Sequence, residues 1–475
     1  MKKRYDYDLI VIGAGSAGLT AAIGGAGIGA KVLLIEKEKI GGDCTHYGCV
    51  PSKTLIKAGR VMRNIKDLKK YGLEDVRVKE ISLDMALKKV QKTIDSIYSH
   101  ETPNKIKEYG IDVELGEASF LNPTTISVKS KSFTAKKFII ATGTRAREPE
   151  IKGIDNVVYM TNKSIFDPKN YSSIAIIGAG PIGCEIGMAL NNLGIRVHII
   201  NPQDQVLNRE DKQAAIIVQD RMVEEGIKLH LETTVFEVKK KGKSKILNLE
   251  NMKSKKMTSI EVDEILVSIG RVPNIEELDL EKAKVKFNER GLIVDKFGRT
   301  SNKRIYGVGD INGGMQFTHL ANSHAKSVLA STIFGFKVKL ETKVIPRVTF
   351  TTPEIASVGI IEKDKLESDL VLMKDYTSVD RAITDSDVTG FFKIIVDKKG
   401  FIKGATIVGE GAGELIGELS VAMKNKIKVT DIADTIHPYP TYGYGLRNTC
   451  DLYRSYGYTK KKKKLVKKIF GLMGD

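Results

Sequence analysis

The 475-residue chain has only four cysteines, and no run of about 18 apolar residues occurs in it. Four cysteines in this length exclude a secreted scaffold held together by disulfides. The missing apolar run predicts that no segment spans a membrane. Met1–Arg4 and the apolar residues after it have the charge pattern of a signal peptide, but that apolar stretch leads into a glycine-rich turn that the fold needs. We therefore expect a cytoplasmic protein of three or four domain-sized units.

Two of the cysteines, Cys44 and Cys49, lie five residues apart in the segment GGDCTHYGCVPSK, residues 41–53. Such a pair can interconvert with a disulfide and hold two electrons. A regular helix would separate their Cα atoms by about 8–9 Å, whereas a disulfide needs less than about 7 Å. We therefore expect a distorted segment, with Gly48 supplying flexibility. Zinc sites space ligands by two to four residues and need a second cluster, so we predict a redox pair and no metal site.

A nucleotide-binding pattern precedes the cysteines. The apolar run Tyr7–Ile12 predicts a buried strand, and an alanine-rich helical stretch follows a GxGxxG turn. A second strand, predicted at Lys31–Ile35, ends at Glu36, whose carboxylate could bind ribose hydroxyls. The glycines permit a tight turn and close approach of a pyrophosphate to the helix N-terminus. The glycines of this turn are Gly13, Gly15 and Gly18.

The same pattern occurs a second time. A strand is predicted at Ser173–Ile177, and a second strand at Arg196–Ile200 ends at Asn201, where the first unit has an acid. The glycines of the second turn are Gly178, Gly180 and Gly183. Asn201 lacks the carboxylate that would repel a 2′-phosphate, so we expect NADPH, or use of both NADPH and NADH. Two dinucleotide folds and a cysteine pair predict a relay from nicotinamide through flavin to a disulfide.

Over about residues 5–450 the chain resembles the class I pyridine nucleotide–disulfide oxidoreductases, the family of dihydrolipoyl dehydrogenase, glutathione reductase and mercuric reductase. Besides the glycine turns and the cysteine segment, four landmarks carry the resemblance: Ala141–Gly143, Ile269–Asn274, Tyr306–Asp310 and Val348–Gly359. The resemblance implies FAD and a nicotinamide as cofactors and a homodimer. It implies cofactor contacts from both glycine turns and from Glu36, Lys53, Gly143, Asn201, Gly270 and Asp310.

The implied fold is α/β, with two Rossmann-like dinucleotide-binding domains, for FAD and NAD(P), and a C-terminal α+β dimerisation domain. We expect strands at Val344–Thr351, Phe391–Val396 and Gly404–Val408 in the last domain, and a helix at Gly411–Lys424. The expected segments are the first flavin part, the nicotinamide domain, the second flavin part, the dimerisation domain and a basic amphipathic tail, at residues 1–150, 151–272, 273–343, 344–455 and 456–475.

The resemblance also implies roles for single residues. Cys44 matches the thiol that exchanges with substrate, and Cys49 matches the thiolate that faces the flavin. Lys53 matches the lysine beside the flavin ring, and Glu185 matches its acidic partner. A cation there would stabilise the negative charge of the reduced ring, and the carboxylate would fix the cation.

The pattern breaks near the C-terminus. Family members that handle dithiols carry His-Pro-Thr-x-x-Glu, in which the glutamate orients a histidine base that acts across the dimer. Here the segment reads HPYPTYGY, residues 437–444. If His437 is aligned with the family's histidine, Tyr442 stands at the glutamate position. If Pro440-Thr441 is aligned with the family's Pro-Thr pair instead, Tyr439 stands at the histidine position and Tyr444 at the glutamate position. We therefore expect His437 to lack its carboxylate; it is either a weak base or a structural residue, and Tyr439 could donate a proton.

The net charge is +18, and the tail carries a third of it. Residues 460–475 contain seven lysines and one aspartate. The apolar residues of the tail fall on one helical face: Leu465, Val466, Ile469, Leu472 and Met473. Segment 460–473 could contact anionic lipid on the inner face of a membrane, or be a solvated tail. Nucleic-acid binding is not expected, because no recognition motif accompanies the lysines.

Two classes of electron acceptor fit these residues. We expect the first, a small-molecule disulfide or dithiol, as for dihydrolipoyl dehydrogenase. The alternative is a metal ion or a quinone, and it gains support from the altered 437–444 segment. A mercuric-reductase-like activity loses support because Cys450 stands alone near the C-terminus, where an extra cysteine pair would be expected. A flavoprotein without enzymatic activity is disfavoured because Cys44, Cys49, Lys53 and Glu185 are all present.

Overall fold

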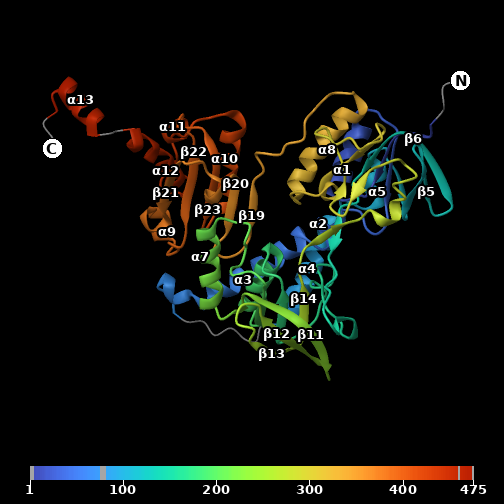
Figure 1. Cartoon of the computed structure of the whole chain (residues 1–475), viewed down its shortest axis with the longest axis horizontal. Coiled ribbons are helices and arrows are strands. Elements are labelled where there is room, and N and C mark those ends of the chain that lie inside the picture. The colour runs from blue at the N-terminus through green and yellow to red at the C-terminus, as the bar shows by residue number, and fades with distance from the viewer. Residues whose placement is uncertain (1–4, 75–81, 458–459, 473–475) are drawn as a thin grey trace. The chain divides into compact units, whose positions relative to one another are not determined.

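The computed structural model describes residues 5–74, 82–457 and 460–472 (Figure 1). The chain forms two compact units. The first unit contains residues 1–62, 78–202 and 232–342, and the second contains residues 63–77, 203–231 and 343–475. The expected α/β class is confirmed. The five expected segment boundaries stay a prediction.

The first unit contains a sheet around the expected first strand, β1 (Tyr7–Ile12). Strands β2 (Val32–Glu36) and β6 (Lys131–Ile140) flank β1 and run parallel to it. The sheet is completed by β3 (Asp112–Leu115), β4 (Ala118–Asn122), β5 (Thr125–Val128) and β18 (Ile305–Gly307). The carboxyl ends of β1 and β2 therefore lie side by side, with the glycine turn directly after β1 and Glu36 at the end of β2.

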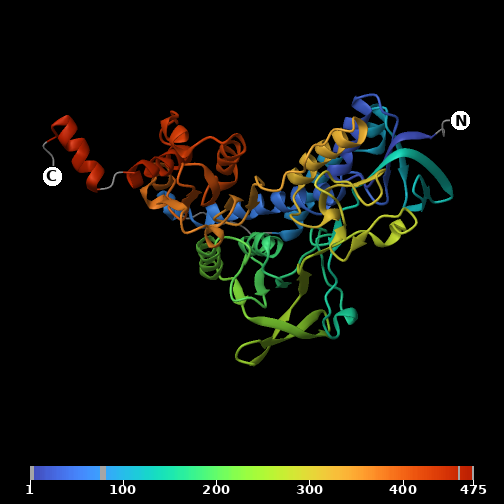
Figure 2. The same cartoon turned by 45° about the horizontal axis from the view of Figure 1, so that its top comes forward.

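Alternation along β1 explains why this sheet is covered on both faces. Leu9 packs with one hydrophobic cluster and Ile10 with another, and both side chains are fully buried. The cluster around Leu9 includes residues of helices α1 (Ser16–Gly27) and α8 (Thr318–Ile333), which lie side by side in both views (Figures 1 and 2). The cluster around Ile10 includes Phe120 and Phe138.

Between β2 and β3 the described residues are mainly helical. The helices are α2 (Gly42–His46), α3 (Cys49–Lys66), α4 (Leu83–Tyr98) and α5 (Pro103–Glu108), with a 3-10 turn at Leu68–Tyr71. Helix α4 starts at a Ser82 cap and buries Leu83, Leu87, Val90 and Ile94, which follow the helical repeat of three to four residues.

The second dinucleotide pattern also folds as expected in the first unit. Strand β8 (Ser173–Ile177) lies between the parallel strands β9 (Arg196–Ile200) and β14 (Glu264–Val267), and α6 (Pro181–Asn192) follows the glycine turn. The sequence did not predict the antiparallel sheet of β11 (Thr233–Lys241), β12 (Ser244–Asn251) and β13 (Met257–Val262). Smaller elements are β7 (Thr144–Ala146), β15 (Arg271–Pro273), β16 (Phe287–Asn288), β17 (Gly291–Leu292) and 3-10 turns at Ile154–Asn156, Glu276–Leu278 and Gly309–Asn312.

The second unit contains an antiparallel sheet in the order β19 (Arg347–Thr349), β20 (Ile355–Gly359), β23 (Ile402–Val408), β22 (Phe391–Val396) and β21 (Leu370–Asp375). The expected strand at Val344–Thr351 is shorter, because Pro346 cannot donate a ladder hydrogen bond. The other elements of this unit are α7 (Lys212–Glu224), β10 (Lys228–His230), α9 (Asp380–Thr384), α10 (Ala412–Asn425), α11 (Val429–Asp434), α12 (Tyr442–Gly457), α13 (Lys460–Phe470) and 3-10 turns at Glu362–Asp364 and Tyr376–Ser378.

A cluster of buried side chains fills the second unit between its sheet and α10, with Phe392, Ile407 and Leu419 fully buried. Among the described residues, no helix has the length and hydropathy that a membrane crossing requires.

Candidate functional site

The first glycine turn is open where a phosphate would approach. A Cβ on Gly13 would come within 2.4 Å of the Ala141 carbonyl oxygen, and one on Gly18 within 1.8 Å of the Gly13 oxygen. A Cβ on Gly15 would meet no atom nearer than 4.0 Å, and no side chain caps the N-terminus of α1 there. Packing therefore requires two of the glycines, while the third leaves backbone N–H groups accessible to an anion.

The side chain of Glu36 is hydrogen-bonded to the same turn. Its Oε2 accepts a hydrogen bond from Ala14 N at 2.7 Å, and its Oε1 accepts one from Glu38 N at 2.8 Å. Each carboxylate oxygen keeps a further lone pair for a ligand hydroxyl. The turn and Glu36 together fit the pyrophosphate and ribose of a dinucleotide, and the ribose contact itself stays a prediction.

The second glycine turn has the same construction. A Cβ on Gly178 would lie 2.5 Å from the Ser268 carbonyl oxygen, and one on Gly183 would lie 2.1 Å from the Gly178 oxygen. A Cβ on Gly180 would meet nothing within 4 Å, and no side chain caps α6. Asn201 follows β9, is 8% exposed and accepts a backbone hydrogen bond from Thr233 N at 2.9 Å. The turn fits a second dinucleotide.

Three further expected cofactor positions lie in loops of the first unit. Gly143 and Gly270 have φ angles of +64° and +120°, which favour glycine. Asp310 lies in the 3-10 turn after β18, where burial raises the pKa of its carboxyl and the nearby Arg271 opposes that rise. A partly buried acid of this kind can accept hydrogen bonds from a bound cofactor.

The cysteine segment is distorted, as predicted. Helix α2 ends at His46, Tyr47 and Gly48 are not helical, and α3 begins at Cys49. Gly48 contributes by close approach, because a Cβ there would lie 3.0 Å from the Asp43 carbonyl oxygen and 3.3 Å from Cys44 Cα. This break brings the thiols within hydrogen-bonding reach of each other.

The two thiols have different environments. Cys44 is half-buried and Cys49 is exposed. The hydrogen bond from the Cys44 thiol lowers the pKa of Cys49 to about 6. Thr318 and the positive charge of Lys53 also lower this pKa, and together these effects outweigh the partial burial of the sulfur, which raises it. The same hydrogen bond and burial raise the pKa of Cys44. The pair therefore holds one thiolate, on Cys49, at neutral pH.

Thr318 is a site residue that the sequence did not indicate. It begins α8, and its Oγ1 lies 3.3 Å from Cys44 Sγ and 3.5 Å from Cys49 Sγ. Thr318 lies 274 residues after Cys44 and 269 residues after Cys49 in the sequence. No motif surrounds it, so only the fold could reveal it.

Lys53 and Glu185 form the expected pair. Lys53 Nζ donates to Glu185 Oε2 at 2.8 Å, and the side chain of Glu185 is 7% exposed whereas that of Lys53 is 36% exposed. Lys53 lies one helical turn after Cys49 in α3, and Glu185 lies in α6. A buried carboxylate that is paired in this way fixes the ammonium group beside the thiolate.

A second charged network begins at Asp43, directly before Cys44. Asp43 Oδ2 lies 3.2 Å from Arg271 Nη2, and Asp43 Oδ1 accepts a hydrogen bond from Asn162 Nδ2 at 2.7 Å. Arg271 Nε also donates to Thr144 Oγ1 at 2.7 Å. These contacts anchor the cysteine segment to β7 and β15. The sequence motif contained Arg271, but gave no signal that it reaches Asp43.

The second unit holds the C-terminal candidates, and one expectation about them is wrong. His437 does have a carboxylate partner, because its Nε2 lies 3.1 Å from Glu418 Oε1 of α10. Its Nδ1 lies 2.9 Å from the Thr435 carbonyl oxygen. The partner precedes the histidine by 19 residues, outside the segment in which the family motif places it. Both ring nitrogens are thus engaged within the unit, and the side chain is 11% exposed.

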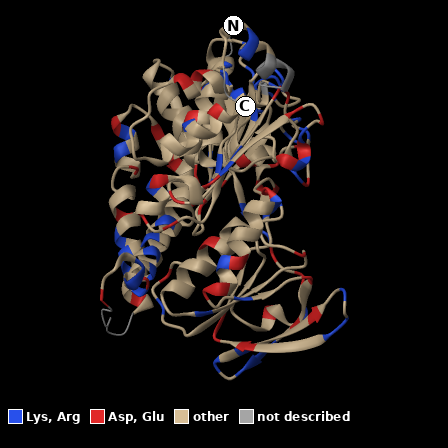
Figure 3. Cartoon of the chain, turned by 90° about the vertical axis from the view of Figure 1, so that its left-hand side faces the viewer, with Lys and Arg blue, Asp and Glu red and all other residues tan. Residues whose placement is uncertain are grey.

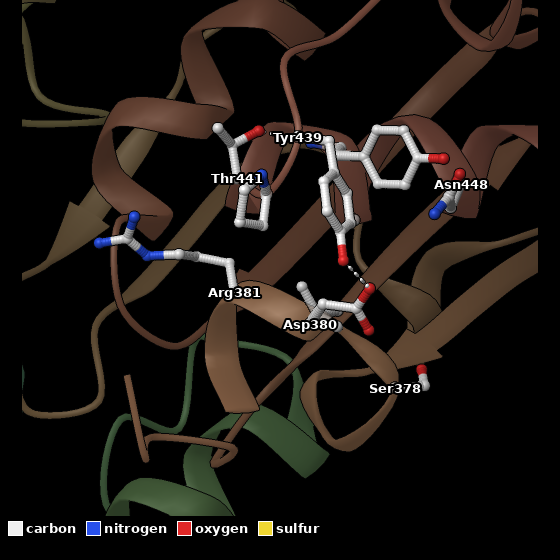
Figure 4. Close-up of a pocket in the computed structure, with 10 residues that line it drawn as sticks. Ser378, Asp380, Arg381, Tyr439, Thr441 and Asn448 are labelled. Atoms are coloured by element: carbon white, nitrogen blue, oxygen red, sulfur yellow. Dashed lines mark hydrogen bonds between the residues drawn. The ribbon is translucent and has the colours of Figure 1, made fainter. Parts of the chain in front are cut away.

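Tyr439 is the exposed member of this segment, with 65% of its surface accessible. It lines a small pocket together with Asp380, Arg381, Thr441, Tyr444 and Asn448 (Figure 4). Its hydroxyl donates to Asp380 Oδ2 at 2.9 Å, and this hydrogen bond raises the pKa of Tyr439 (Figure 4). The phenol is therefore held in its protonated form at neutral pH.

The other two tyrosines of the segment differ from Tyr439. Tyr444 packs edge-on against Tyr439, with ring centroids 5.5 Å apart. Tyr442 is half-buried, donates to Asp385 Oδ2 at 3.2 Å and packs on Tyr376. Burial and Asp385 raise its pKa. Of the three, Tyr439 presents a hydroxyl at an exposed position.

Sequence relatives with assigned names span almost the whole chain. A mercuric reductase of Bacillus cereus is 34% identical over 449 residues, covering 93% of this chain and 71% of the relative. A dihydrolipoyl dehydrogenase of Geobacillus stearothermophilus is 34% identical over 453 residues, covering 92% and 94%. The Cu(II) complex of the HOCl-induced flavoprotein disulfide reductase RclA from Escherichia coli superposes with a TM-score of 0.83 at 25% identity, covering 93% and 99%.

Family domains account for both units. Residues 7–325 match the pyridine nucleotide-disulphide oxidoreductase domain, and residues 345–449 match the dimerisation domain of the same family. The matched ranges contain both glycine turns, the cysteine pair and the 437–444 segment. This chain belongs to the pyridine nucleotide–disulfide oxidoreductases, flavoproteins that use FAD and NAD(P)H.

Proposed function

We propose that the protein passes two electrons from NAD(P)H through FAD to the Cys44–Cys49 disulfide and from there to an external acceptor. The unequal environments of the two thiols carry this proposal. Hydrogen bonding and Lys53 favour a thiolate on Cys49, while the pKa of Cys44 is raised. A pair that divides its protons in this way suits one thiol for contact with the flavin and the other for exchange with the acceptor.

A bound FAD would supply two-electron chemistry between the nicotinamide and the disulfide. The S–S bond then breaks, and the two sulfurs together take up two electrons and one proton. Cys44 retains that proton and Cys49 remains a thiolate. Lys53, fixed by Glu185 at 2.8 Å, holds positive charge beside the thiolate, and Thr318 donates a hydrogen bond to whichever sulfur carries more charge.

For the acceptor we propose a metal ion or a quinone ahead of a dithiol or a small disulfide. Dithiol chemistry needs an exposed base that moves the thiol proton. Both ring nitrogens of His437 already bond within the unit, whereas Tyr439 offers an exposed but protonated phenol. The mercuric reductase relatives and the Cu(II) complex of RclA support the metal-ion alternative. The dihydrolipoyl dehydrogenase relatives keep the disulfide alternative in place.

Two further parts of the proposal concern assembly and cofactor choice. In a homodimer, Tyr439 of one protomer would complete the thiol site of the other, and the dimerisation domain supports such an assembly.

We propose NADPH, or both nicotinamides, as the electron source, because Asn201 carries no charge that would repel a 2′-phosphate.

Anaerobic titration with reduced nicotinamide tests the relay. Two-electron reduction should produce long-wavelength charge-transfer absorption between the Cys49 thiolate and oxidised flavin. Cys49→Ser should abolish this absorption, and Cys44→Ser should show it without any reductant. A Cys44→Ser protein with no long-wavelength absorption at any pH would reverse the assignment of the two thiols. Titration of the reduced protein with each acceptor in turn then identifies the acceptor class.

A further inference from the structure

Helix α13 (Lys460–Phe470) lies beyond both family matches, which end at residues 325 and 449. Most of its apolar side chains are exposed, with Leu465 at 57%, Ile469 at 63%, Phe470 at 70% and Leu472, just after the helix, at 56%, while Val466 is half-buried. Exposed apolar residues gathered on one short element indicate an interaction surface more than isolated ones do.

The spacing of these residues makes the helix amphipathic. At 100° per residue, Leu465, Ile469 and Leu472 fall within about 60° of one another, and Val466 and Phe470 extend the same arc. Lys467 and Lys468 lie on the opposite side of these turns, and Lys460–Lys464 form the first turns of the helix. Met473, which the sequence also placed on the apolar face, lies outside the described residues.

The charge of residues 460–475 is almost entirely positive. Elsewhere basic and acidic residues are interspersed along the chain (Figure 3). Residues 460–475 carry seven lysines against one aspartate. A high density of positive charge next to an apolar arc complements a surface that is negatively charged outside and apolar just beneath, as an anionic bilayer is.

We propose that α13 docks the protein on an anionic lipid surface. The helix lies along the interface, because its 11 residues are too few to cross the hydrocarbon layer, which takes about 20. The leucine, isoleucine and phenylalanine side chains enter the acyl boundary while the lysines remain among the headgroups. A nucleic acid or an acidic protein surface would use the lysines but leave this apolar arc in water.

Vesicle co-sedimentation of the full-length, FAD-loaded protein tests the docking. We expect binding to vesicles that contain phosphatidylglycerol, little binding to pure phosphatidylcholine, and weakening as salt rises. Lys467→Gln/Lys468→Gln should lower binding by about fivefold per lysine. Leu465→Gln/Ile469→Gln keeps the charge and should lower binding at least about tenfold through the lost apolar contact.

The matched control is Lys240→Gln/Lys243→Gln, in the β11–β12 hairpin, where both lysines are exposed. This variant makes the same change in net charge and should bind vesicles like the parent protein. Equal loss in the control would make binding a matter of total charge and overturn the proposal. So would full binding by the Leu465→Gln/Ile469→Gln variant, no binding to anionic vesicles at low salt, or a change in oligomeric state of that variant by light scattering. All of these readouts are independent of the proposed electron transfer.

Discussion

Two pairs of polar side chains, one in each unit, have similar hydrogen-bond lengths but different exposure. Lys53 and Glu185 are 2.8 Å apart with a carboxylate that is 7% exposed, and Tyr439 and Asp380 are 2.9 Å apart at a tyrosine that is 65% exposed. Burial gives the first pair a fixed charge, whereas water screens the second. The thiol site is therefore organised within one chain, while the Tyr439 segment would gain strength only where another surface excludes water.

The largest expected effect is a difference in turnover between substitutions of Tyr439 and of His437. Tyr439→Phe should lower turnover by about 10²–10⁴-fold with acceptors that need a proton at the thiols, because the phenol is the exposed donor. His437→Ala should change turnover little and act mainly on stability, since its ring bonds Glu418 and Thr435 within the unit.

Steady-state kinetics with dihydrolipoamide, glutathione disulfide and a quinone check this difference. We expect feeble turnover of the two sulfur substrates in the parent protein and less effect of either substitution on the quinone. Vigorous lipoamide activity that collapses in His437→Ala would restore a histidine base and remove the contrast between the two residues.

The next effect concerns the thiolate. The lowered pKa of Cys49 means that charge-transfer absorption should be present above about pH 6 and lost as the pH falls through that value. Thr318→Val removes a hydrogen bond to the charged sulfur and should raise the midpoint by about 1–2 pH units. Ser327→Ala, on the same helix and bonded to Ser323 O, is the control. An unchanged midpoint in Thr318→Val would show that Thr318 does not stabilise the thiolate.

A substitution at the nicotinamide site should have a smaller effect on kinetics than a substitution at the thiol site. Asn201→Glu introduces the carboxylate that the first glycine-turn unit has at Glu36, and should shift preference toward NADH by about tenfold in kcat/KM, or about 1.4 kcal/mol. Measurement of kcat/KM with NADH and NADPH for both proteins checks this shift. A parent protein that already prefers NADH more than tenfold would contradict the proposed nicotinamide choice.

The smallest effect sharpens the difference between the two pairs. Asp380→Asn should change turnover by less than about fivefold, because its partner is exposed to water. The matched change Glu185→Gln removes the buried negative charge that pairs with Lys53 and should reduce turnover far more. Equal effects of the two substitutions would mean that exposure does not distinguish the pairs, and would imply that Asp380 is buried in the working assembly.

Local sequence signals predicted the parts of the site that lie within one stretch of chain. The glycine turns, the strands before them and the break at Gly48 depend on neighbouring residues, and each was found where it was expected. The hydrogen-bond partners that set the charges were not predictable in this way. Thr318 lies 274 residues from Cys44 and Glu418 lies 19 residues from His437, each on another helix, and no motif surrounds either residue.

Two fold elements were missed or misjudged for different reasons. Pro346 shortened the expected strand at Val344–Thr351, and this proline was visible in the sequence. Strand β12 alternates buried and partly exposed residues, but in β11 the lysines of Lys239–Lys241 interrupt the pattern and β13 is mostly exposed. Tertiary pairing, with β12 between β11 and β13, compensates for the weak apolar signal.

The N-termini of two long helices meet the thiols, because α3 begins at Cys49 and α8 begins at Thr318. Their partial positive charges stabilise the thiolate, which exists only in the reduced pair. Stabilising the reduced form raises the reduction potential of a disulfide. The Cys44–Cys49 pair should therefore take electrons from the nicotinamide readily and release them only to a comparatively strong oxidant.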